Sequence, residues 1–136
     1  MDDYDYDLFE SLRQAIKLGD INTVRLILDA GFDVNTRSRY GVTALIVASR
    51  YGHTEIANLL IQRGADIDAR DNDGDTPLTY ASGLGHREIA ILLIQRGADI
   101  NIENIYGSTA IASAYLNHHT EVVEVLRQAG AIQDFL

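Results

Sequence analysis

The chain has 136 residues, 46% of them hydrophobic, which is enough for one domain with a continuous core. Its 20 acidic and 11 basic residues give a formal net charge of −9, which disfavours nucleic acid and anionic membranes as partners because both are bound mainly by Lys and Arg. Cysteine is absent, which excludes disulfides and thiolate metal sites and fits a reducing compartment.

The first residues argue against export and membrane insertion. Residues 1–7 read Met-Asp-Asp-Tyr-Asp-Tyr-Asp, whereas a signal peptide needs a basic region followed by an apolar one. No apolar run approaches the roughly 20 residues of a membrane-spanning helix. We therefore expect a cytoplasmic protein in which the Asp-Tyr run is a solvated tail.

The whole chain is built on a repeat of 33 residues, and a fixed period of this size indicates a stacked-repeat protein. Residues 52–68 recur as residues 85–101 with the same order of apolar, glycine and acidic positions. Gly41, Gly74 and Gly107 keep the same spacing, and a threonine follows each of them two positions later. We expect one domain, residues 1–136, made of four units at about 5–37, 38–70, 71–103 and 104–136.

The first unit is a diverged copy. Its glycines keep the spacing of the repeat, but Leu8, Glu10 and Ser11 stand where later units have Gly, Thr and Pro or Ala. Polar residues on its first helix indicate the solvated face of a terminal capping unit. These polar residues are Arg13, Gln14 and Lys17.

The third unit shows the local structure expected in each copy. Thr76 suits a helix N-cap, because its hydroxyl can accept a hydrogen bond from an unpaired amide, and Pro77 suits the first helical position. We expect a short helix to about residue 82 and a second helix from about 87 to 95, with apolar residues at i, i+3 and i+4. Gly97 ends the second helix, and a polar turn leads into the next unit.

The last unit departs from the pattern at two positions. His118 replaces the glycine between its helices, and Ile132 replaces a loop aspartate. Both changes suit a terminal unit that no further unit follows, and we expect the chain to be complete as a folding unit. A helix pair cannot bury its apolar face alone, so stacking on neighbouring pairs must supply the core.

The third unit resembles the ankyrin repeat family at full spacing. The matching residues are Gly74-Asp75-Thr76-Pro77-Leu78, Ala81-Ser82, Gly85-His86, Glu88-Ile89-Ala90, Leu92-Leu93 and Gly97-Ala98-Asp99-Ile100-Asn101. The resemblance covers essentially the whole chain and implies an all-α solenoid of stacked antiparallel helix pairs, joined by projecting β-hairpin-like loops, that binds other proteins. The family's usual histidine after Thr-Pro-Leu is replaced by Ile46, Thr79 and Ala112, which removes a common local hydrogen-bond network.

No group of residues predicts catalysis, a cofactor or a metal ion. His53, His86 and His119 share one repeat position, and the family resemblance implies that they form hydrogen bonds between units. His118 and His119 lack a nearby third ligand for zinc. Residues 66–75 are rich in aspartate, but no glutamate closes them as a calcium loop. We expect these aspartates to bond turn amides and to cap helices.

Positions that differ between the units cannot all be required by the fold, so they are the candidates for partner binding. They lie at the loop tips before each first helix and at the end of that helix. By the family resemblance they share one concave surface, aromatic and basic toward the second unit and acidic at the third. Tyr and Arg dominate binding hot spots because they bury large areas and keep a polar group. The predicted partner-binding residues are Tyr6, Phe9, Arg39, Tyr40, Val42, Arg50, Tyr51, Asn72, Asp73, Asp75, Leu84, Ile105, Tyr106 and Leu116.

We predict a non-catalytic module that binds another protein through its concave face and hairpin tips. We expect it to be a monomer with no cofactor and no nucleic-acid or membrane partner. The alternative is an acidic decoy or inhibitor that blocks a basic, nucleic-acid-binding surface of its target. A decoy would depend on Asp71, Asp73, Asp75 and the N-terminal aspartates, and its affinity would fall steeply with salt.

Overall fold

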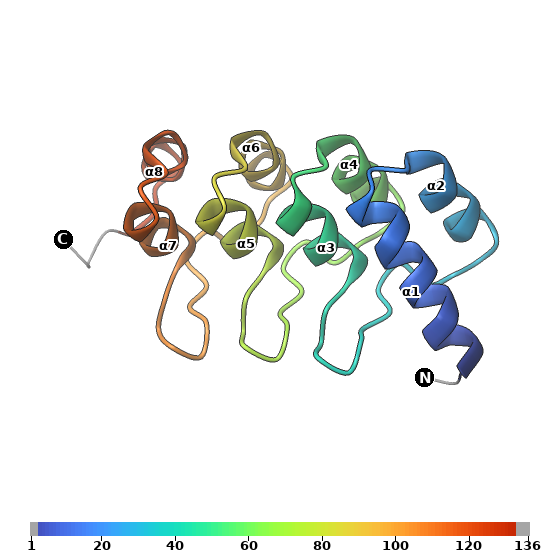
Figure 1. Ribbon diagram of the computed structural model, residues 1–136. Coiled ribbons are helices and arrows are strands. Elements are labelled where there is room, and N and C mark those ends of the chain that lie inside the picture. Colours follow the sequence, from blue (N-terminus) through green and yellow to red (C-terminus); the bar gives the residue numbers. More distant parts are fainter. Residues whose placement is uncertain (1–2, 133–136) are drawn as a thin grey trace.

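The computed structural model describes residues 3–132, which form helices and loops but no strand. The helices form four pairs stacked in chain order, with the first helix of each pair in an inner row and the second in an outer row (Figure 1). The helices are α1 (Asp3–Lys17), α2 (Ile21–Asp29), α3 (Ala44–Tyr51), α4 (Thr54–Gln62), α5 (Pro77–Gly83), α6 (Arg87–Gln95), α7 (Ala110–Leu116) and α8 (Thr120–Gln128). This arrangement confirms the predicted all-α solenoid of helix pairs. None of the helices in the described part is long and apolar enough to cross a membrane.

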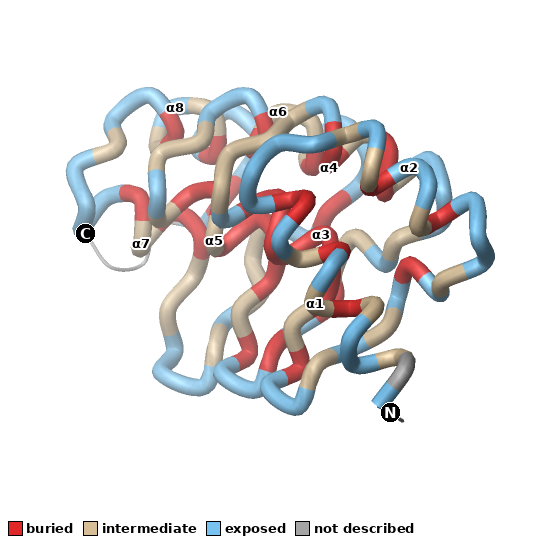
Figure 2. The backbone as a smooth tube through the Cα atoms, turned by 45° about the vertical axis from the view of Figure 1, so that its right-hand side comes forward, coloured by how far each residue is buried: buried red, intermediate tan, exposed pale blue. Residues whose placement is uncertain are grey.

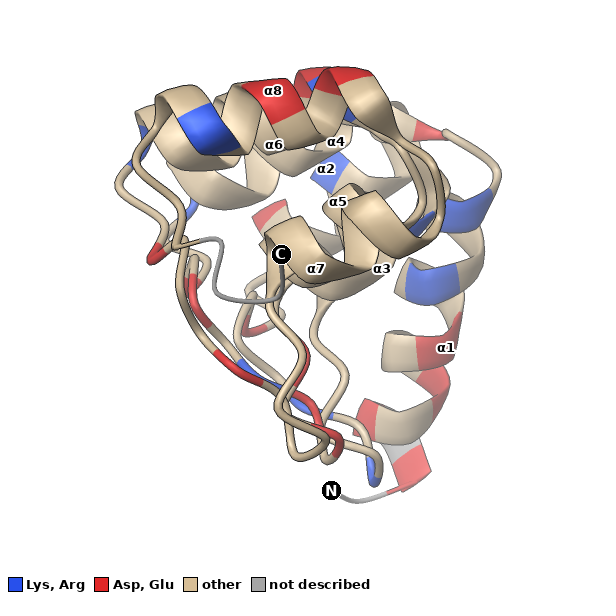
Figure 3. Ribbon diagram, turned by 90° about the vertical axis from the view of Figure 1, so that its left-hand side faces the viewer, with Lys and Arg blue, Asp and Glu red and all other residues tan. Residues whose placement is uncertain are grey.

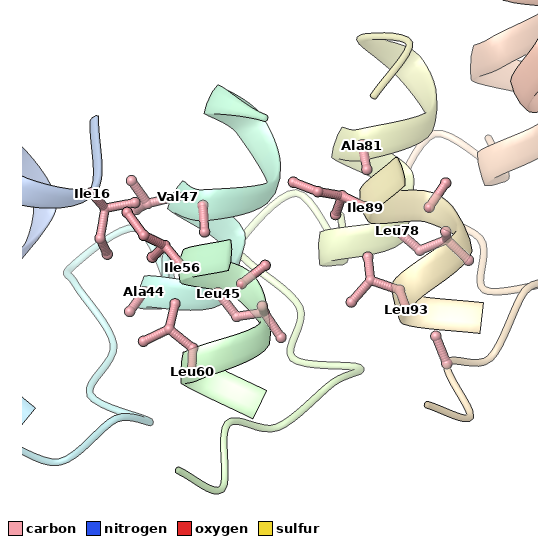
Figure 4. Packing of buried hydrophobic residues seen from close by; sticks show 14 of the residues in the cluster. Ile16, Ala44, Leu45, Val47, Ile56, Leu60, Leu78, Ala81, Ile89 and Leu93 are labelled. Atoms are coloured by element: carbon pink, nitrogen blue, oxygen red, sulfur yellow. The ribbon is translucent and has the colours of Figure 1, made fainter. Parts of the chain in front are cut away.

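The core lies between the two rows of helices, where buried residues face each other (Figure 2). Ile56 and Leu60 of α4 pack toward Leu45 of α3 (Figure 4). Ile89 and Leu93 of α6 repeat the arrangement toward α5 (Figure 4). Burial of each such side chain contributes about 1.5–3 kcal/mol. The 33-residue period therefore places the same apolar contacts in each pair and makes one continuous core.

Threonine caps start the inner helices. The hydroxyl oxygens of Thr43, Thr76 and Thr109 each accept a hydrogen bond from the amide three residues later. The predicted N-cap at Thr76 and the proline at the first helical position are confirmed. Thr79 also accepts from the Thr76 amide at 2.7 Å, which completes a capping box. Thr79 thus provides a local network in place of the family's histidine.

Histidine and asparagine side chains join neighbouring pairs. His53 Nε2 donates to the Lys17 carbonyl at 3.0 Å, and His86 Nε2 donates to the Arg50 carbonyl at 2.9 Å. These bonds confirm the predicted role of His53 and His86, whereas the His119 side chain forms no such bond within residues 3–132. At the last interface Asn117 Nδ2 reaches the Gly83 carbonyl at 2.9 Å. Each bond satisfies a carbonyl near the end of an inner helix, where no amide of that helix can do so.

The projecting loops are hairpin-like, and they bond to one another through the main chain. The Ser38, Asp71 and Asn104 amides each donate to the carbonyl four residues later, which closes the three loops. The Asn72 amide donates to the Tyr40 carbonyl at 2.9 Å, and the Ile105 amide donates to the Asp73 carbonyl at 3.0 Å. The loops therefore form a connected row along one side of the helix stack (Figure 1).

The first unit corrects two predictions. Ser11 is equivalent to Ala44, the first residue of α3, yet α1 begins at Asp3. The described part of the expected solvated tail, residues 3–7, is therefore helical, and Tyr6 and Phe9 lie in a helix instead of at a loop tip. Residues 1–2 of that tail lie outside the described residues.

Three features explain the longer helix. The unit lacks the glycine and the threonine that end a loop and start a helix in later units. Phe9, Leu12 and Ile16 form a buried stripe at helical spacing, and the Phe9 ring lies 6.4 Å from the Phe32 ring. Asp3 and Asp5 in the first turn also favour the helix, because carboxylates stabilise a helix N-terminus.

The last two helix pairs approach each other closely at Gly85. Gly85 and Gly107 have φ of +79° and +78°, so alanine at either position carries a similar left-handed strain, of order 1–2 kcal/mol. A Cβ at Gly85 would lie 2.5 Å from His119 Nδ1, whereas a Cβ at Gly107 would meet nothing within 4 Å. We expect Gly85→Ala to lower the free energy of unfolding in urea by about 1–3 kcal/mol more than Gly107→Ala does. Equal losses would contradict this packing.

Ser49 and Ser82 are equivalent buried serines with different bonding. Ser49 Oγ donates to the Leu45 carbonyl at 2.8 Å, whereas Ser82 Oγ has no hydrogen-bond partner in the described part of the chain. We expect Ser49→Ala to destabilise the protein by about 1 kcal/mol and Ser82→Ala to be neutral or stabilising, because only Ser82→Ala removes an unsatisfied buried hydroxyl. Urea unfolding of both variants measures the difference, and a larger loss for Ser82→Ala would contradict the expectation.

Candidate functional site

Half of the predicted partner-binding residues line a single pocket. The pocket lies between α1, the first projecting loop and α3, and its volume is about 640 Å³. We call it the N-terminal pocket. It is lined by Tyr6, Phe9, Glu10, Arg13, Arg37, Ser38, Arg39, Tyr40, Val42, Val47, Arg50 and Tyr51. Predicted residues from three separate segments, Tyr6 and Phe9, Arg39 to Val42, and Arg50 and Tyr51, thus meet at one site.

The length of α1 creates this pocket. The N-terminal half of α1 runs down beside the projecting loops instead of ending at the level of the other inner helices (Figure 1). Seen along the stack, α1 lies on the other side of the molecule from the loops, with acidic residues in its lower half and basic residues nearer the other helices (Figure 3). The helix therefore supplies one wall and the first loop supplies the opposite wall.

Basic and aromatic side chains pair within the pocket. The Arg39 guanidinium lies 5.3 Å from the centre of the Tyr40 ring. Arg50 lies 5.9 Å from the Tyr51 ring and 5.6 Å from the Tyr80 ring. Such cation–π contacts hold a guanidinium in place without neutralising it. Neither Arg39 nor Arg50 forms an ion pair with a carboxylate among residues 3–132.

Arg13 differs from these two arginines. It forms an ion pair with Glu10 at 3.0 Å, and the hydrogen bond to Glu10 is the main reason that its pKa is raised. Among the described residues, Glu10 is the one carboxylate that lines the pocket. The Glu10–Arg13 pair therefore leaves Arg39 and Arg50 without an ion-paired carboxylate in this pocket.

The structure moves one predicted residue into the core and gives two others an internal role. Phe9 is only 4% exposed and packs on Phe32, so its prediction as an exposed loop-tip contact is wrong. Asn72 Nδ2 donates to the Arg39 carbonyl at 3.1 Å. Asp75 Oδ1 accepts from Asn104 Nδ2 at 3.0 Å. Asn72 and Asp75 thus hold neighbouring loops together.

The remaining predicted residues lie outside the N-terminal pocket. Asp73, Ile105 and Tyr106 are exposed at the tips of the later loops, and Tyr106 is 77% exposed. Leu84 and Leu116 are exposed at the ends of α5 and α7. A second, smaller pocket of about 310 Å³ runs past α5 and α7, and Arg50 lines both pockets. Its lining is Arg50, Asp75, Thr79, Tyr80, Gly83, Leu84, Asn104, Ser113 and Asn117.

Sequence reasoning missed Arg13, Arg37 and Tyr80 as site residues. The sequence predicts Arg13 on a solvated capping face, whereas it lines the pocket beside Glu10. Tyr80 is equivalent to Val47 and Ser113, so it varies between units as the predicted residues do. Applying the same test of variation to the middle of the first helix would have identified it.

The aspartates of the second projecting loop bond to the loop itself. Asp71 Oδ1 accepts from the Asp73 and Asp75 amides at 3.0 Å, and its other carboxylate oxygen accepts from the Tyr80 hydroxyl. These bonds confirm that Asp71 satisfies turn amides. Burial raises the pKa of Asp75, and the charges of Asp71 and Asp73 raise it further. Burial and the bond to Asp71 raise the pKa of Tyr80.

Asp75 gives a pH-dependent test of this loop. Because its folded-state pKa is raised, ionised Asp75 opposes folding at neutral pH, and the stability gained by protonation is lost as the pH rises through that pKa. We expect Asp75→Asn to unfold at a higher urea concentration than the wild type at pH 7. The difference should shrink toward zero as the pH falls through the raised pKa. The exposed Asp73→Asn is the matched control, and an effect as large as that of Asp75→Asn would contradict the role of burial.

Comparison with known proteins agrees with this architecture. A family model described as ankyrin repeats (3 copies) matches residues 12–104 and, in a second, overlapping match, residues 73–134. A search of curated proteins finds no match to the chain. Ankyrin repeats generally serve as protein–protein interaction modules and are typically not catalytic. From its repeat, its stacked helix pairs and this match, the chain belongs to the ankyrin repeat family.

Proposed function

We propose that this protein is a non-catalytic module that binds another protein through its inner face. The inner face consists of the ends of α1, α3, α5 and α7 together with the projecting loops. It corresponds to the concave surface that the family resemblance implies. The N-terminal pocket is the centre of the proposed contact, and the exposed loop tips extend it.

The gathering of Arg39, Tyr40, Arg50 and Tyr51 in one pocket carries this proposal, because neither arginine forms an ion pair among the described residues. Tyr40 is 63% exposed, and the Arg39 guanidinium lies over its ring. Arg50 is exposed and lies over two tyrosine rings. Residues of these types supply most of the binding energy in known interfaces, because they bury much area at a low entropy cost. The fold itself does not require them, since the third unit holds Asn72, Asp73 and Gly83 at the positions equivalent to Arg39, Tyr40 and Arg50.

The polar groups of the chain support binding better than catalysis. His53 and His86 each donate a hydrogen bond from a ring nitrogen to a main-chain carbonyl of the preceding unit. Asp71 accepts hydrogen bonds from turn amides and a tyrosine hydroxyl. These side chains hold the solenoid together. An acidic decoy has less support, because Asp71 and Asp75 bond within the loops and the pocket that gathers the predicted residues is basic.

The test replaces exposed side chains of the pocket and leaves the core intact. Tyr51 packs partly against the core, so it is retained. We expect the triple variant Arg39→Ala, Tyr40→Ala and Arg50→Ala to lose at least about 100-fold in affinity for proteins captured from extract of the native cell, as expected for hot-spot residues. Its urea unfolding midpoint should stay close to that of the wild type.

The matched control carries three exposed substitutions on the outer row, Arg25→Ala and Leu26→Ala in α2 and Arg87→Ala in α6. This variant should bind the captured proteins as the wild type does, with quantitative mass spectrometry and titration of each purified partner as measurements. Full-strength binding by the pocket variant, together with loss in the outer-row variant, would place the contact on the opposite face and reject the proposal.

A further inference from the structure

We infer that the N-terminal pocket binds an extended peptide segment of the partner that carries aspartate or glutamate side chains. The segment continues toward α5 and α7 with an apolar side chain. This inference rests on the proposed function and specifies the chemistry of the partner at the same surface.

Three cations near the N-terminal pocket lack an ion-pair partner within residues 3–132. The chain has 20 acidic and only 11 basic residues, yet Lys17, Arg39 and Arg50 form no ion pair with a carboxylate in the described part of the chain. Lys17 Nζ and the Arg50 guanidinium lie 6.0 and 5.9 Å from the centre of the same ring, Tyr51. Two cations on one ring repel each other, and a carboxylate from a partner would relieve that repulsion.

The tyrosines also restrict the arginines. The Arg39 guanidinium lies over the Tyr40 ring, and the Arg50 guanidinium lies over the Tyr51 and Tyr80 rings. A carboxylate can accept two parallel hydrogen bonds from a guanidinium group. Contacts with the rings limit the conformations of both arginines before a ligand arrives, which lowers the entropy cost of binding a carboxylate.

The N-terminal pocket has the size and the lining of a ligand site. A volume of about 640 Å³ lies within the range of roughly 300–1,000 Å³ that is usual for ligand sites. Val42 and Val47 line it beside the tyrosine rings, and the apolar lining favours an aliphatic or aromatic side chain between the acidic ones. The pocket therefore suits several side chains of a peptide better than a lone ion.

The residue type at the ends of the inner helices changes along the stack. Lys17, Arg50, Gly83 and Leu116 are equivalent positions at the ends of α1, α3, α5 and α7. They change from basic in the first two units to small and apolar in the last two. Leu116 is 70% exposed, and Leu84 beside Gly83 is 50% exposed. A segment that starts at the arginines therefore meets two exposed leucines as it passes α5 and α7, beside the mostly polar lining of the second pocket.

A nucleic acid fits this surface less well than an acidic peptide. The net charge of −9 repels a phosphate chain, and Asp71, Asp73 and Asp75 lie on the loop next to the pocket. A peptide can place its few carboxylates at the arginines and an uncharged, apolar side chain beside that loop, whereas a polynucleotide carries a charge at every residue.

The experiment needs no identified partner, because it selects ligands from random peptides. Peptides of about 12 residues, which span roughly 40 Å when extended, are displayed on phage and selected against the full chain. We expect enrichment of peptides that combine aspartate or glutamate with an aliphatic or aromatic residue. Selected peptides are then synthesised with a fluorescent label and titrated against the wild type and the variants. Their affinity should fall as salt is raised from about 0.01 to 1 M, which shortens the Debye length from roughly 30 to 3 Å.

Two charge-matched variants locate the contact. Arg39→Gln with Arg50→Gln should weaken the acidic peptides about tenfold or more, whereas Arg25→Gln with Arg87→Gln on the outer helices should leave them unchanged. Replacing the acidic residues of a selected peptide by their amides should cause a similar loss. Equal binding to all these variants and peptides would overturn the inference.

The remaining outcomes separate this inference from the proposed function. Selected peptides without acidic residues that still fail to bind the Arg39→Ala, Tyr40→Ala, Arg50→Ala variant would overturn the acidic class and leave the binding surface in place. Selection of no peptide would overturn the extended segment as ligand, and tighter binding of a labelled single-stranded oligonucleotide would overturn the peptide. Loss of captured cellular partners in the same alanine variant would support the proposed function under either result.

Discussion

No helix pair can bury its apolar side chains by itself, and the rest of the structure depends on this constraint. Leu60, Leu93 and Leu126 occupy equivalent positions in the outer row and are all 0% exposed. Ile27 takes the same position in the first unit but is only partly buried, because no helix pair of the described chain lies before it. Each pair is thus stable through its neighbours, and equivalent contacts recur from one interface to the next. The regular spacing of inner-helix ends and loops follows from this repetition.

The same constraint leaves a defined set of side chains free to vary. Neighbouring loops are joined by bonds from the Asn72 amide to the Tyr40 carbonyl and from the Ile105 amide to the Asp73 carbonyl. Because these bonds use the main chain, the side chains of Tyr40 and Ile105 can change without loss of the connection. Helix ends are held in a similar way, since His86 bonds to the carbonyl of Arg50 and not to its guanidinium. The main-chain atoms of these residues thus serve the fold, and their side chains are available for the proposed binding.

The first unit differs from the others, and its first helix forms one wall of the N-terminal pocket. Its helix continues to Asp3 where other units have a loop, and its buried stripe holds it against the body of the protein. Beside the pocket, the N-terminal half of α1 is acidic and its C-terminal half is basic (Figure 3). Aromatic rings hold Arg39 and Arg50 where no carboxylate of the described chain pairs with them. A strongly acidic protein thus presents a local basic surface.

The family resemblance implied the hydrogen bonds of His53 and His86 between units. The sequence by itself determined the all-α fold, the N-cap at Thr76 and the second helix of the third unit. These features depend on local signals or on a period of 33 residues, which can be read along the chain. Candidate residues such as Arg39, Tyr40 and Arg50 could also be chosen by their variation between units. Only the tertiary structure decided that α1 replaces the first loop and that Tyr6 and Tyr51 line one pocket. The contact of Phe9 with Phe32 and the meeting of distant segments are packing events, and no local sequence pattern encodes them.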